Sequence, residues 1–324
     1  MLSDSFSRQF SYLRLSLTEV CNFKCNYCLP DGYHCDTPKS ELKLSEIALL
    51  ARCFADLGTN KIRLTGGEPS LRKDLVEVIE ICSQTEGIEH LAMTTNGFKL
   101  AKHAKQWKQA GLNHINISVD SLDPRQFAAI TGTNSFVKVM AGVDEALNQG
   151  FRSIKLNAVL IKQLAKHGFE QYLNWIKHRP VEVRFIEVME IGANPEYFEQ
   201  HHIAGTGFKQ QLLSRGWQAQ IRAHNAGPAE VFYHPDYAGK VGLIMPYAKD
   251  FCSTCNRLRV SSQGRLHLCL FGEEGIELRD LLYSPLQQAA LTQRIEQALL
   301  SKKGTHFLHD GNTGATPHLA SIGG

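Results

Sequence analysis

The sequence predicts an α/β protein, in which an incomplete (β/α)6 barrel of the TIM type is followed by a smaller α+β domain. Short strand-like runs alternate with helix-like runs up to about residue 191, which is typical of parallel strands joined by crossover helices. Six such strands are too few for a closed eight-stranded barrel, so an incomplete barrel or an open sheet is expected. After residue 192 the chain changes to loops rich in Gly, Pro and His with short strand-like segments.

Apolar periodicity gives the expected elements in order. The first part contains strands at 12–17, 61–65, 89–94, 113–119, 152–160 and 181–188, and helices at 45–57, 72–84, 98–110, 135–149 and 165–178. The second part contains strands at 229–233 and 241–245 and a hairpin at 257–270 that turns at Gln263-Gly264. We therefore divide the chain into a barrel (1–205), a second domain (206–310) and a flexible tail (311–324).

Composition indicates an ordinary globular protein with enough apolar residues for a large core. Of its 324 residues, 43% are hydrophobic and 21% are charged, and the formal net charge is +3. Because no basic stripe accompanies this small charge, no nucleic-acid partner is expected. No apolar run approaches membrane-spanning length, so no membrane insertion is expected. Nine cysteines behind a polar start, MLSDSFSRQF, indicate a reducing compartment and hence a cytoplasmic protein.

Four of the predicted strands carry a polar residue at every second position. These polar residues are Tyr12, Arg14 and Ser16; Lys61, Arg63 and Thr65; Asn116, Ser118 and Asp120; and Lys155 and Asn157. Strands of a helix-covered parallel sheet are usually apolar on both faces, so this row must face something polar and enclosed, such as a barrel lumen used as an active site. Each long side chain taken singly could instead reach water from a strand end. The strand at 181–188 keeps the register less cleanly, because Arg184 and Glu187 fall on opposite faces.

Two turns at strand ends add to the expected site. Gly66-Gly67-Glu68-Pro69 follows the strand at 61–65, and Thr94-Thr95-Asn96-Gly97 follows the strand at 89–94. A Gly-Gly turn lets the backbone approach a ligand closely, although taken alone it is most often an ordinary turn. Barrel folds keep their active sites at the carboxyl ends of the strands, so both turns and Ser118 are candidates for ligand binding.

A first set of cysteines, Cys21, Cys25 and Cys28, follows the first strand with the spacing C-x3-C-x2-C. A disulfide across so few residues is strained, and three thiols leave one over. A zinc site needs a fourth ligand, for which His34 or Cys35 would have to serve. A 4Fe-4S cluster fits better, because three thiolates leave its fourth iron open for a substrate or cofactor.

A second set, Cys252, Cys255 and Cys269, repeats the number of three with the spacing C-x2-C-x13-C. A second cluster with an open iron is expected, and zinc with His267 as the fourth ligand is the alternative. Between these cysteines, Arg257 and Arg259 share one face of an extended segment, which suits a phosphate-bearing substrate unless the segment is an exposed strand edge.

The remaining cysteines receive no chemical role. Cys53 and Cys82 fall within amphipathic helices and are expected to be small core residues, and Cys35 is left over in a loop.

These motifs resemble known families. The first cysteine set with Tyr27 before its last member, the Gly-Gly-Glu-Pro turn and the partial barrel resemble the radical S-adenosylmethionine (SAM) enzymes. The second set with its two arginines and the terminal Ile322-Gly323-Gly324 resembles, within them, the GTP-cyclising family of molybdenum cofactor (molybdopterin) biosynthesis. The resemblance runs from about Arg14 to the last residue. Two departures are Leu319, where a Met is expected, and the extra thiol of Cys35.

The resemblance implies an activity and its cofactors. Such an enzyme holds two 4Fe-4S clusters, cleaves SAM to a 5'-deoxyadenosyl radical and converts GTP into 3',8-cyclo-7,8-dihydro-GTP. It also implies an electron donor of the flavodoxin or ferredoxin type, a cyclic pyranopterin monophosphate synthase as the next enzyme, and a homodimer as one state of assembly.

The resemblance further implies roles for individual residues of this sequence. SAM would be bound by Tyr27, Gly67, Ser118 and Met189. GTP would be held by Arg14, Arg63, Thr94, Lys155, Arg257 and Arg259, with the open iron of the second cluster against the purine. The terminal Gly323 and Gly324 would enter the active site and act in catalysis.

Two other function classes stay open from the residues alone. A peptide-modifying radical SAM enzyme with a second cluster would share both cysteine sets, but it would not need five cations converging on a triphosphate. A non-enzymatic zinc or iron-sulfur module would need neither the Gly-Gly-Glu-Pro turn nor the polar lumen.

Overall fold

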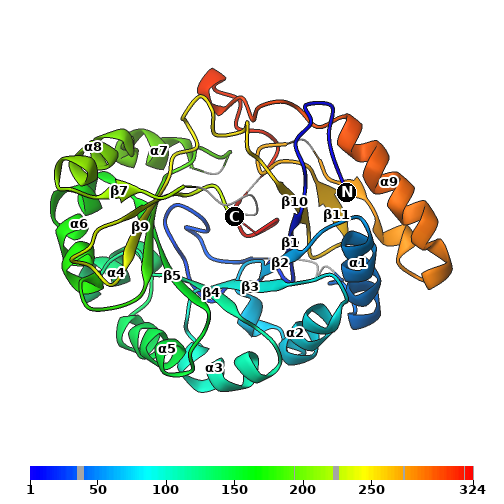
Figure 1. Cartoon of the computed structure of the whole chain (residues 1–324), viewed down its shortest axis with the longest axis horizontal. Coiled ribbons are helices and arrows are strands. Elements are labelled where there is room, and N and C mark those ends of the chain that lie inside the picture. The colour runs from blue at the N-terminus through cyan, green and yellow to red at the C-terminus, as the bar shows by residue number, and fades with distance from the viewer. Residues whose placement is uncertain (35–39, 193, 222–225, 273, 317, 324) are drawn as a thin grey trace.

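The computed structural model describes residues 1–34, 40–192, 194–221, 226–272, 274–316 and 318–323. Strands surround a central space and helices lie outside them, and the C-terminal end of the chain lies inside this ring (Figure 1). All strands belong to one sheet of order β12-β11-β10-β1-β2-β3-β4-β5-β6-β9-β8-β7. Because the sheet begins at β12 and ends at β7, it is open, and the expected incomplete barrel is confirmed.

The first part of the chain forms the predicted alternation of strands and helices. Its strands are β1 (Tyr12–Ser16), β2 (Lys61–Thr65), β3 (His90–Thr95), β4 (His114–Ser118), β5 (Ser153–Leu160) and β6 (Glu182–Glu187). Its helices are α1 (Leu44–Asp56), η1 (Pro69–Leu71), α2 (Leu75–Gln84), α3 (Leu100–Gln109), α4 (Pro124–Thr131), α5 (Phe136–Asn148) and α6 (Lys162–Ile176). Helix α2 begins at Leu75, three residues later than predicted, and the short η1 turn before it was not predicted. Helix α4 was not predicted, although Asp123 caps its start and Gly132 ends it in a left-handed conformation.

The second part of the chain extends the same sheet at both edges. It contains α7 (Pro195–His201), α8 (Thr206–Ser214), β7 (Gln218–Ala219), β8 (Glu230–Tyr233), β9 (Lys240–Ile244), β10 (Arg257–Val260), β11 (Arg265–His267), β12 (Ile276–Glu277), η2 (Arg279–Leu281), η3 (Pro285–Gln287), α9 (Gln288–Leu300) and η4 (Leu308–Asp310). Strand β9 pairs in parallel with β6, and β10 pairs in parallel with β1. The strands past residue 205 therefore continue the barrel wall, and the division at 205 and 310 stays a prediction.

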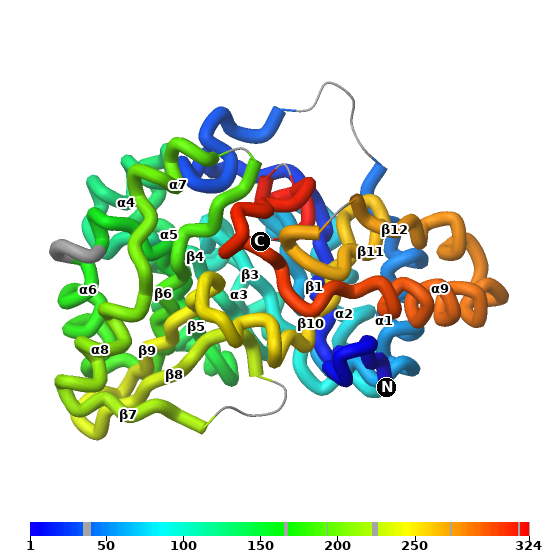
Figure 2. Tube along the Cα trace, turned by 90° about the horizontal axis from the view of Figure 1, so that it is seen from above, coloured from blue at the N-terminus to red at the C-terminus, as the bar shows by residue number. Residues whose placement is uncertain are grey.

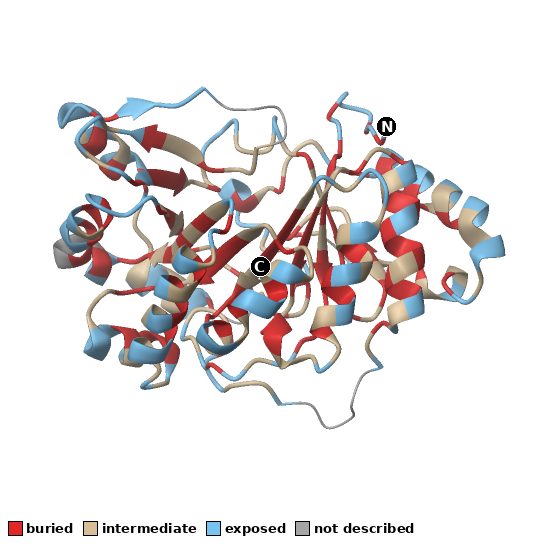
Figure 3. Cartoon of the chain, turned by 60° about the horizontal axis from the view of Figure 1, so that its bottom comes forward, coloured by how far each residue is buried: buried red, intermediate tan, exposed pale blue. Residues whose placement is uncertain are grey.

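The core lies between the sheet and its outer helices. The apolar members of the alternating strands, such as Leu13, Leu15, Ile62 and Leu64, are fully buried. Buried residues concentrate along the strands and on the helix faces turned toward them (Figure 3). Because side chains alternate across a strand, the polar members of the same strands face the inside of the barrel.

The last described residues run back over the sheet. In the view from above, the red C-terminal segment lies over its middle (Figure 2). Ile322 is 3% exposed and packs in a small cluster with Leu308, Leu270, Phe271 and Ile191. This packing gives the tail a fixed path in the structure.

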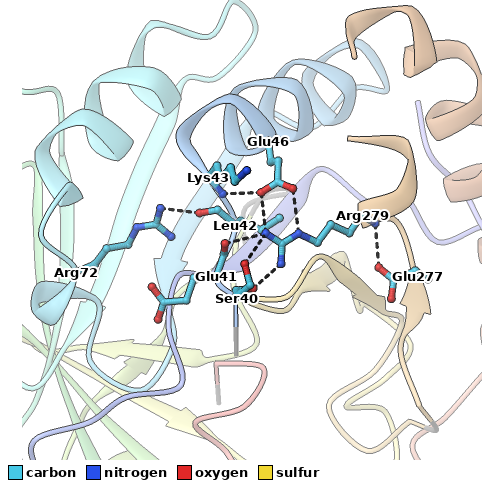
Figure 4. A network of polar contacts seen from close by, with 8 residues as sticks. All are labelled: Ser40, Glu41, Leu42, Lys43, Glu46, Arg72, Glu277 and Arg279. Atoms are coloured by element: carbon cyan, nitrogen blue, oxygen red, sulfur yellow. Dashed lines mark hydrogen bonds and ion pairs between the residues drawn. The ribbon is translucent and has the colours of Figure 1, made fainter. Parts of the chain in front are cut away.

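Two arginines hold the segment before α1 from opposite sides (Figure 4). Arg279, from the second part of the chain, forms an ion pair with Glu46 of α1 at 2.9 Å and donates to the Ser40 and Glu41 carbonyls. Arg72 donates to the Leu42 carbonyl at 2.6 Å. Arg279 thereby attaches the second part of the chain to residues 40–46 of the first part.

None of the helices in the described part of the chain combines the length and the apolar composition required to cross a bilayer.

Candidate active site

Three arginines occupy matching positions on three neighbouring strands. Arg14 of β1 is in register with Arg63 of β2 on one side and with Arg259 of β10 on the other. Paired residues of adjacent strands have their side chains on the same face, so the three guanidinium groups face the lumen together. Strand alternation predicted this direction for Arg14 and Arg63, and the pairing of β1 with β10 adds Arg259.

These arginines line a cavity that we call the cationic cavity. Its charged lining consists of seven basic residues, with no carboxylate among the described residues around it: Arg14, Lys61, Arg63, Lys155, Arg184, Arg257 and Arg259. Glu182, just outside this lining, forms ion pairs with Lys155 at 3.7 Å and with Arg184. One carboxylate does not balance seven positive charges, so the cavity suits a strongly anionic ligand such as a triphosphate.

The pKa values of buried groups report the same excess of positive charge. Burial alone would raise the pKa of the Tyr12 phenol, but the charges of Arg63, Arg14 and Lys61 outweigh it and lower the pKa to about 6. Burial, together with the charge of Arg184, lowers the pKa of Lys155 to about 7. Both shifts have the direction expected when charges of one sign are collected with little compensation.

The second cysteine set lines the cationic cavity as well. Cys252, Cys255 and Cys269 are half-buried in its wall. Burial would raise the pKa of the Cys255 thiol, but the charges of Arg257 and Lys302 outweigh burial and lower it. A lowered pKa favours the thiolate, which is the form that binds metals.

Three thiols in one wall provide the donor set of a 4Fe-4S cluster. Such a cluster binds thiolates on separate irons, so its three sulfur ligands stand apart along the wall. A single zinc ion would instead need four ligands around one centre, with His267 as the fourth. In the described ranges of the chain, no three His, Cys, Asp or Glu side chains converge closely enough to hold one metal ion.

The first cysteine set lines a neighbouring cavity, which we call the first-loop cavity. It is lined by Cys21, Cys25 and Cys28 together with Tyr27, Gly67, Ser118 and Met189, the four residues expected around SAM. Burial raises the pKa of the Cys21 thiol to about 11 and that of the Cys28 thiol to about 12. Burial here favours the neutral thiols, so a bound cluster would have to displace their protons.

Tyr27 is fixed by a buried carboxylate that the sequence analysis did not single out. The Tyr27 hydroxyl donates to Asp120 at 2.9 Å, and the Val159 amide donates to the same carboxylate at 2.9 Å. Asp120 is 2% exposed, and burial raises its pKa to about 6. It ties the cysteine loop to the ends of β4 and β5. In the sequence, the only sign of this role was that Asp120 continues the alternating polar row of β4.

The Gly-Gly-Glu-Pro turn packs against the backbone of residues 18–20, just before the first cysteine set. A Cβ on Gly67 would lie 2.4 Å from the Val20 carbonyl oxygen, so only glycine fits there. The next residue, Glu68, is 1% exposed and accepts hydrogen bonds from Thr95 at 2.7 Å and from the Asn96 amide at 2.6 Å. Both predicted turns are therefore locked to each other and to the start of the loop.

The two cavities meet inside the barrel. Thr94, Asn157, Ile186 and Met189 line both of them. A radical formed in the first-loop cavity would reach a ligand in the cationic cavity across these side chains. The junction thus gives the two predicted ligands adjacent places.

The end of the chain reaches the arginine row. The Gly323 carbonyl accepts hydrogen bonds from Arg14 Nε at 3.1 Å and from Arg259. Gly323 has a φ of +68°, and a Cβ on it would lie 2.2 Å from Thr65 of β2. The position therefore requires glycine on two counts. Gly324 and Cys35 lie outside the described residues.

Sequence reasoning missed three further contributors to the cationic cavity. Tyr12 and Lys61 belong to the predicted polar row but were given no role, and Arg184 was set aside because its strand breaks the register. In the structure Arg184 faces the lumen, whereas Glu187 accepts a hydrogen bond from the Gly205 amide. The two residues do lie on opposite faces of β6, and the inner one belongs to the site.

Comparisons with known proteins agree with this geometry. A model described as the Radical SAM superfamily matches residues 15–176, and one described as Molybdenum Cofactor Synthesis C matches residues 181–308. In the fold alone, the chain resembles a crystal structure of Streptococcus suis SuiB bound to S-adenosylmethionine, with a TM-score of 0.61 and 13% identity over 81% of this chain and 61% of that chain.

Relatives of similar length are much closer in sequence. The chain is 55% identical to a GTP 3',8-cyclase of Vibrio vulnificus (strain CMCP6) over 99% of this chain and 97% of that protein. It is 56% identical to a GTP 3',8-cyclase of Cronobacter sakazakii over 100% of this chain and 99% of that protein. The chain therefore belongs to the GTP 3',8-cyclase family of radical SAM enzymes.

Proposed function

We propose that this protein converts GTP into 3',8-cyclo-7,8-dihydro-GTP, the first step of molybdenum cofactor biosynthesis, and that it uses two 4Fe-4S clusters. The observation that carries the proposal is the junction of two thiol-lined cavities at Thr94 and Met189, of which one is also lined by seven basic residues. A peptide substrate would not require this concentration of positive charge.

The first-loop cavity would bind SAM. Cys21, Cys25 and Cys28 would hold the first cluster, which when bound would supply the electron for the cleavage of SAM to methionine and the 5'-deoxyadenosyl radical. Tyr27, Gly67, Ser118 and Met189 orient SAM in this cavity. The Asp120 carboxylate fixes Tyr27 through its hydroxyl, and the glycine turn lets backbone groups approach the ligand.

The cationic cavity would bind GTP. Arginine forks match phosphate oxygens and stay charged, so Arg14, Arg63, Arg257 and Arg259, with Lys155 and Thr94, hold the nucleotide. Cys252, Cys255 and Cys269 would hold the second cluster beside the purine. With C3' of the ribose at the junction, its hydrogen would pass to the 5'-deoxyadenosyl radical, and C3' would then bond to C8 of guanine. One electron from the donor and one proton would complete 3',8-cyclo-7,8-dihydro-GTP. Burial at the junction excludes water from the carbon radical.

The chain terminus would complete the GTP site. Gly323 is bonded to two of the proposed phosphate ligands, Arg14 and Arg259, and its lack of a side chain lets the tail enter a filled pocket. We assign Gly323 and Gly324 to the positioning of GTP for hydrogen abstraction. Correct orientation can lower an activation barrier by several kcal/mol.

The activity implies partners beyond the chain. An electron donor of the flavodoxin or ferredoxin type reduces the first cluster, and a cyclic pyranopterin monophosphate synthase consumes the product. We place the enzyme in the cytoplasm, where thiols stay reduced.

Anaerobic reconstitution with iron, sulfide, SAM, dithionite and GTP, followed by mass spectrometry of the nucleotide, tests the proposal. The wild type should hold about eight irons per chain and form the cyclic nucleotide. Changing Cys21, Cys25 and Cys28 to Ala should abolish SAM cleavage while about four irons remain. A wild type that holds about one iron or a zinc, or that leaves GTP intact, contradicts the proposal.

The arginine assignment has its own test. Arg257→Ala should weaken GTP binding by about 2 kcal/mol, the scale for losing a charge-assisted hydrogen bond in a desolvated site. SAM cleavage without GTP should survive, because Arg257 does not line the first-loop cavity. An equal loss of SAM binding would show that the assignment is wrong.

A further inference from the structure

Two buried cations lie on the outer side of the second cysteine set. Cys252, Cys255 and Cys269 line the cationic cavity and also a second cavity, the outer cavity, which includes Arg8 and Lys302 in its lining. The three thiols therefore stand between the two cavities. Neither cation belongs to the cationic cavity, and the proposed reaction has so far given neither of them a role.

Arg8 binds the backbone on both sides of the outer cavity. Its side chain is 7% exposed, and Nη1 donates to the Cys252 carbonyl at 3.0 Å and to the Gly304 carbonyl at 2.8 Å. Nη2 donates to the Lys303 carbonyl at 2.7 Å, and the Asp4 carboxylate holds Nε at 2.7 Å. One guanidinium thus joins the first cysteine of the set to residues 303 and 304, which follow α9.

Lys302 contacts the backbone next to Cys269, as Arg8 does at Cys252. It is 5% exposed, its ammonium donates to the Leu268 carbonyl, and it lies 5.3 Å from the centre of the Phe10 ring. Leu268 directly precedes Cys269, so the contact fixes the approach to the last thiol of the set. A carbonyl and an aromatic ring leave the positive charge of the ammonium in place.

A buried charge is costly unless an opposite charge lies near it. The charge of Arg8 is already paired with the buried Asp4 carboxylate at 2.7 Å, whereas three thiolates on one cluster would provide negative charge at the wall that Lys302 faces. Net charge, hydrogen bonding and exposure set the reduction potential of iron-sulfur clusters, and a buried cation stabilises the reduced form, which carries one more negative charge.

We propose that Arg8 and Lys302 are positioning residues for the second cluster, which fix the backbone beside Cys252 and Cys269, and that the charge of Lys302 raises the reduction potential of the cluster. This inference rests on the proposed function, because it requires that the second cysteine set hold a 4Fe-4S cluster. The role of Arg8 is to link Cys252 to the segment that follows α9, since lysine could not reproduce its fork across three carbonyls. The role of Lys302 is to place a positive charge beside the cluster.

The experiment uses full-length protein in which Cys21, Cys25 and Cys28 are Ala, so that only the second cluster contributes. Iron per chain is counted, and the midpoint potential is measured by a redox titration followed by electron paramagnetic resonance. Lys302→Met should shift the potential downward, whereas Lys302→Arg should keep it. Lys249→Met is the matched control, because Lys249 is exposed three residues before Cys252, lines neither cavity and removes the same charge where water screens it. It should leave the potential unchanged.

Arg8→Lys provides a second variant that keeps the charge and loses the fork. It should lower the iron content per folded chain, with circular dichroism as the check of folding. An unchanged potential in Lys302→Met with full iron in Arg8→Lys overturns the inference, and so does an equal shift in Lys249→Met. A background protein that holds no cluster at all overturns the proposal of two clusters instead, so the two failures are distinguishable.

Discussion

At the scale of single residues, the register of three strands creates a charge problem that a ligand would solve. Arg259, Arg14 and Arg63 lie side by side on β10, β1 and β2, and like charges at paired positions destabilise a sheet. The Gly323 carbonyl meets two of them, yet a carbonyl carries no net charge. A bound triphosphate would neutralise the row, which makes its binding sensitive to the protonation of the other cations nearby.

Lys155 should make GTP binding depend on pH. Because the pKa of Lys155 is lowered to about 7, its ammonium is protonated below that pH and becomes neutral as pH rises through it. Phosphate groups are largely ionised by pH 7. A fall in GTP affinity above that pH therefore comes from the protein. We expect GTP affinity to fall between pH 7 and pH 8.5 in the wild type, and Lys155→Met to bind more weakly at pH 7 with a smaller fall.

Equilibrium binding of GTP to the anaerobic protein at several pH values measures this effect. Lys105→Met is a suitable control, because Lys105 is exposed on α3 outside the barrel and does not line the cationic cavity. The explanation is wrong if Lys155→Met keeps the full pH dependence of the wild type.

Residues whose roles depend on distant contacts could not be predicted from the sequence. Alternation of period two is local, and it was enough to direct Arg14, Arg63 and Lys155 into the lumen. The contact of Tyr27 with Asp120 joins residues 93 positions apart, and that of Arg8 with Cys252 joins residues 244 apart. Only the topology of the whole sheet decides such pairs.

At the scale of elements, the barrel was predictable and parts of the second half were not. Long strands with clear alternation, such as β5, have a strong local signal, whereas β7 and β12 have only two residues each. Helix α9 was missed, although Leu291, Ile295 and Leu299 form one buried stripe. Its N-cap residue, Gln287, makes no capping hydrogen bond through its side chain, so the usual sign of a helix start is weak.

The tail is the element whose path is most sensitive to one substitution. Gly323→Ala should remove cyclisation while both clusters and SAM cleavage remain, because the new Cβ would meet Thr65 at 2.2 Å and the backbone has a φ of +68°. The measurement is the rate of cyclic nucleotide formation beside the rate of SAM cleavage in the same sample.

Gly311→Ala is the matched control for the tail. Gly311 has a φ of +75° in the same segment, but a Cβ there would have no atom within 4 Å. It therefore carries the backbone strain of the first variant, about 1 kcal/mol, without its clash. Equal activity of the two variants would show that the contact with Thr65 does not matter.

At the scale of the whole molecule, the open barrel is completed by strands from the far end of the chain. Parallel pairing of β10 with β1 and of β9 with β6 brings the second cysteine set to the same lumen as the first. The active site therefore depends on how firmly the second part of the chain is attached. Arg279 provides a partly buried attachment point at the start of α1, where it contacts Ser40, Glu41 and Glu46 (Figure 4).

Arg279→Met should destabilise the protein far more than the same change at a nearby exposed arginine. Its partner Glu46 has a side chain that is 4% exposed and its own side chain is 18% exposed, so losing Arg279 should cost about 2 kcal/mol, because the Glu46 carboxylate loses its charged partner. Arg294 pairs with Asp280, but their side chains are 35% and 52% exposed, so Arg294→Met should cost less than about 1 kcal/mol. Urea unfolding of the cluster-free chains measures both changes in the free energy of unfolding, and Glu46→Gln combined with Arg279→Met should recover part of the loss because no buried charge remains. Equal destabilisation by the two arginine variants, or no recovery in the double variant, would show that the pair with Glu46 does not fasten the two parts of the chain.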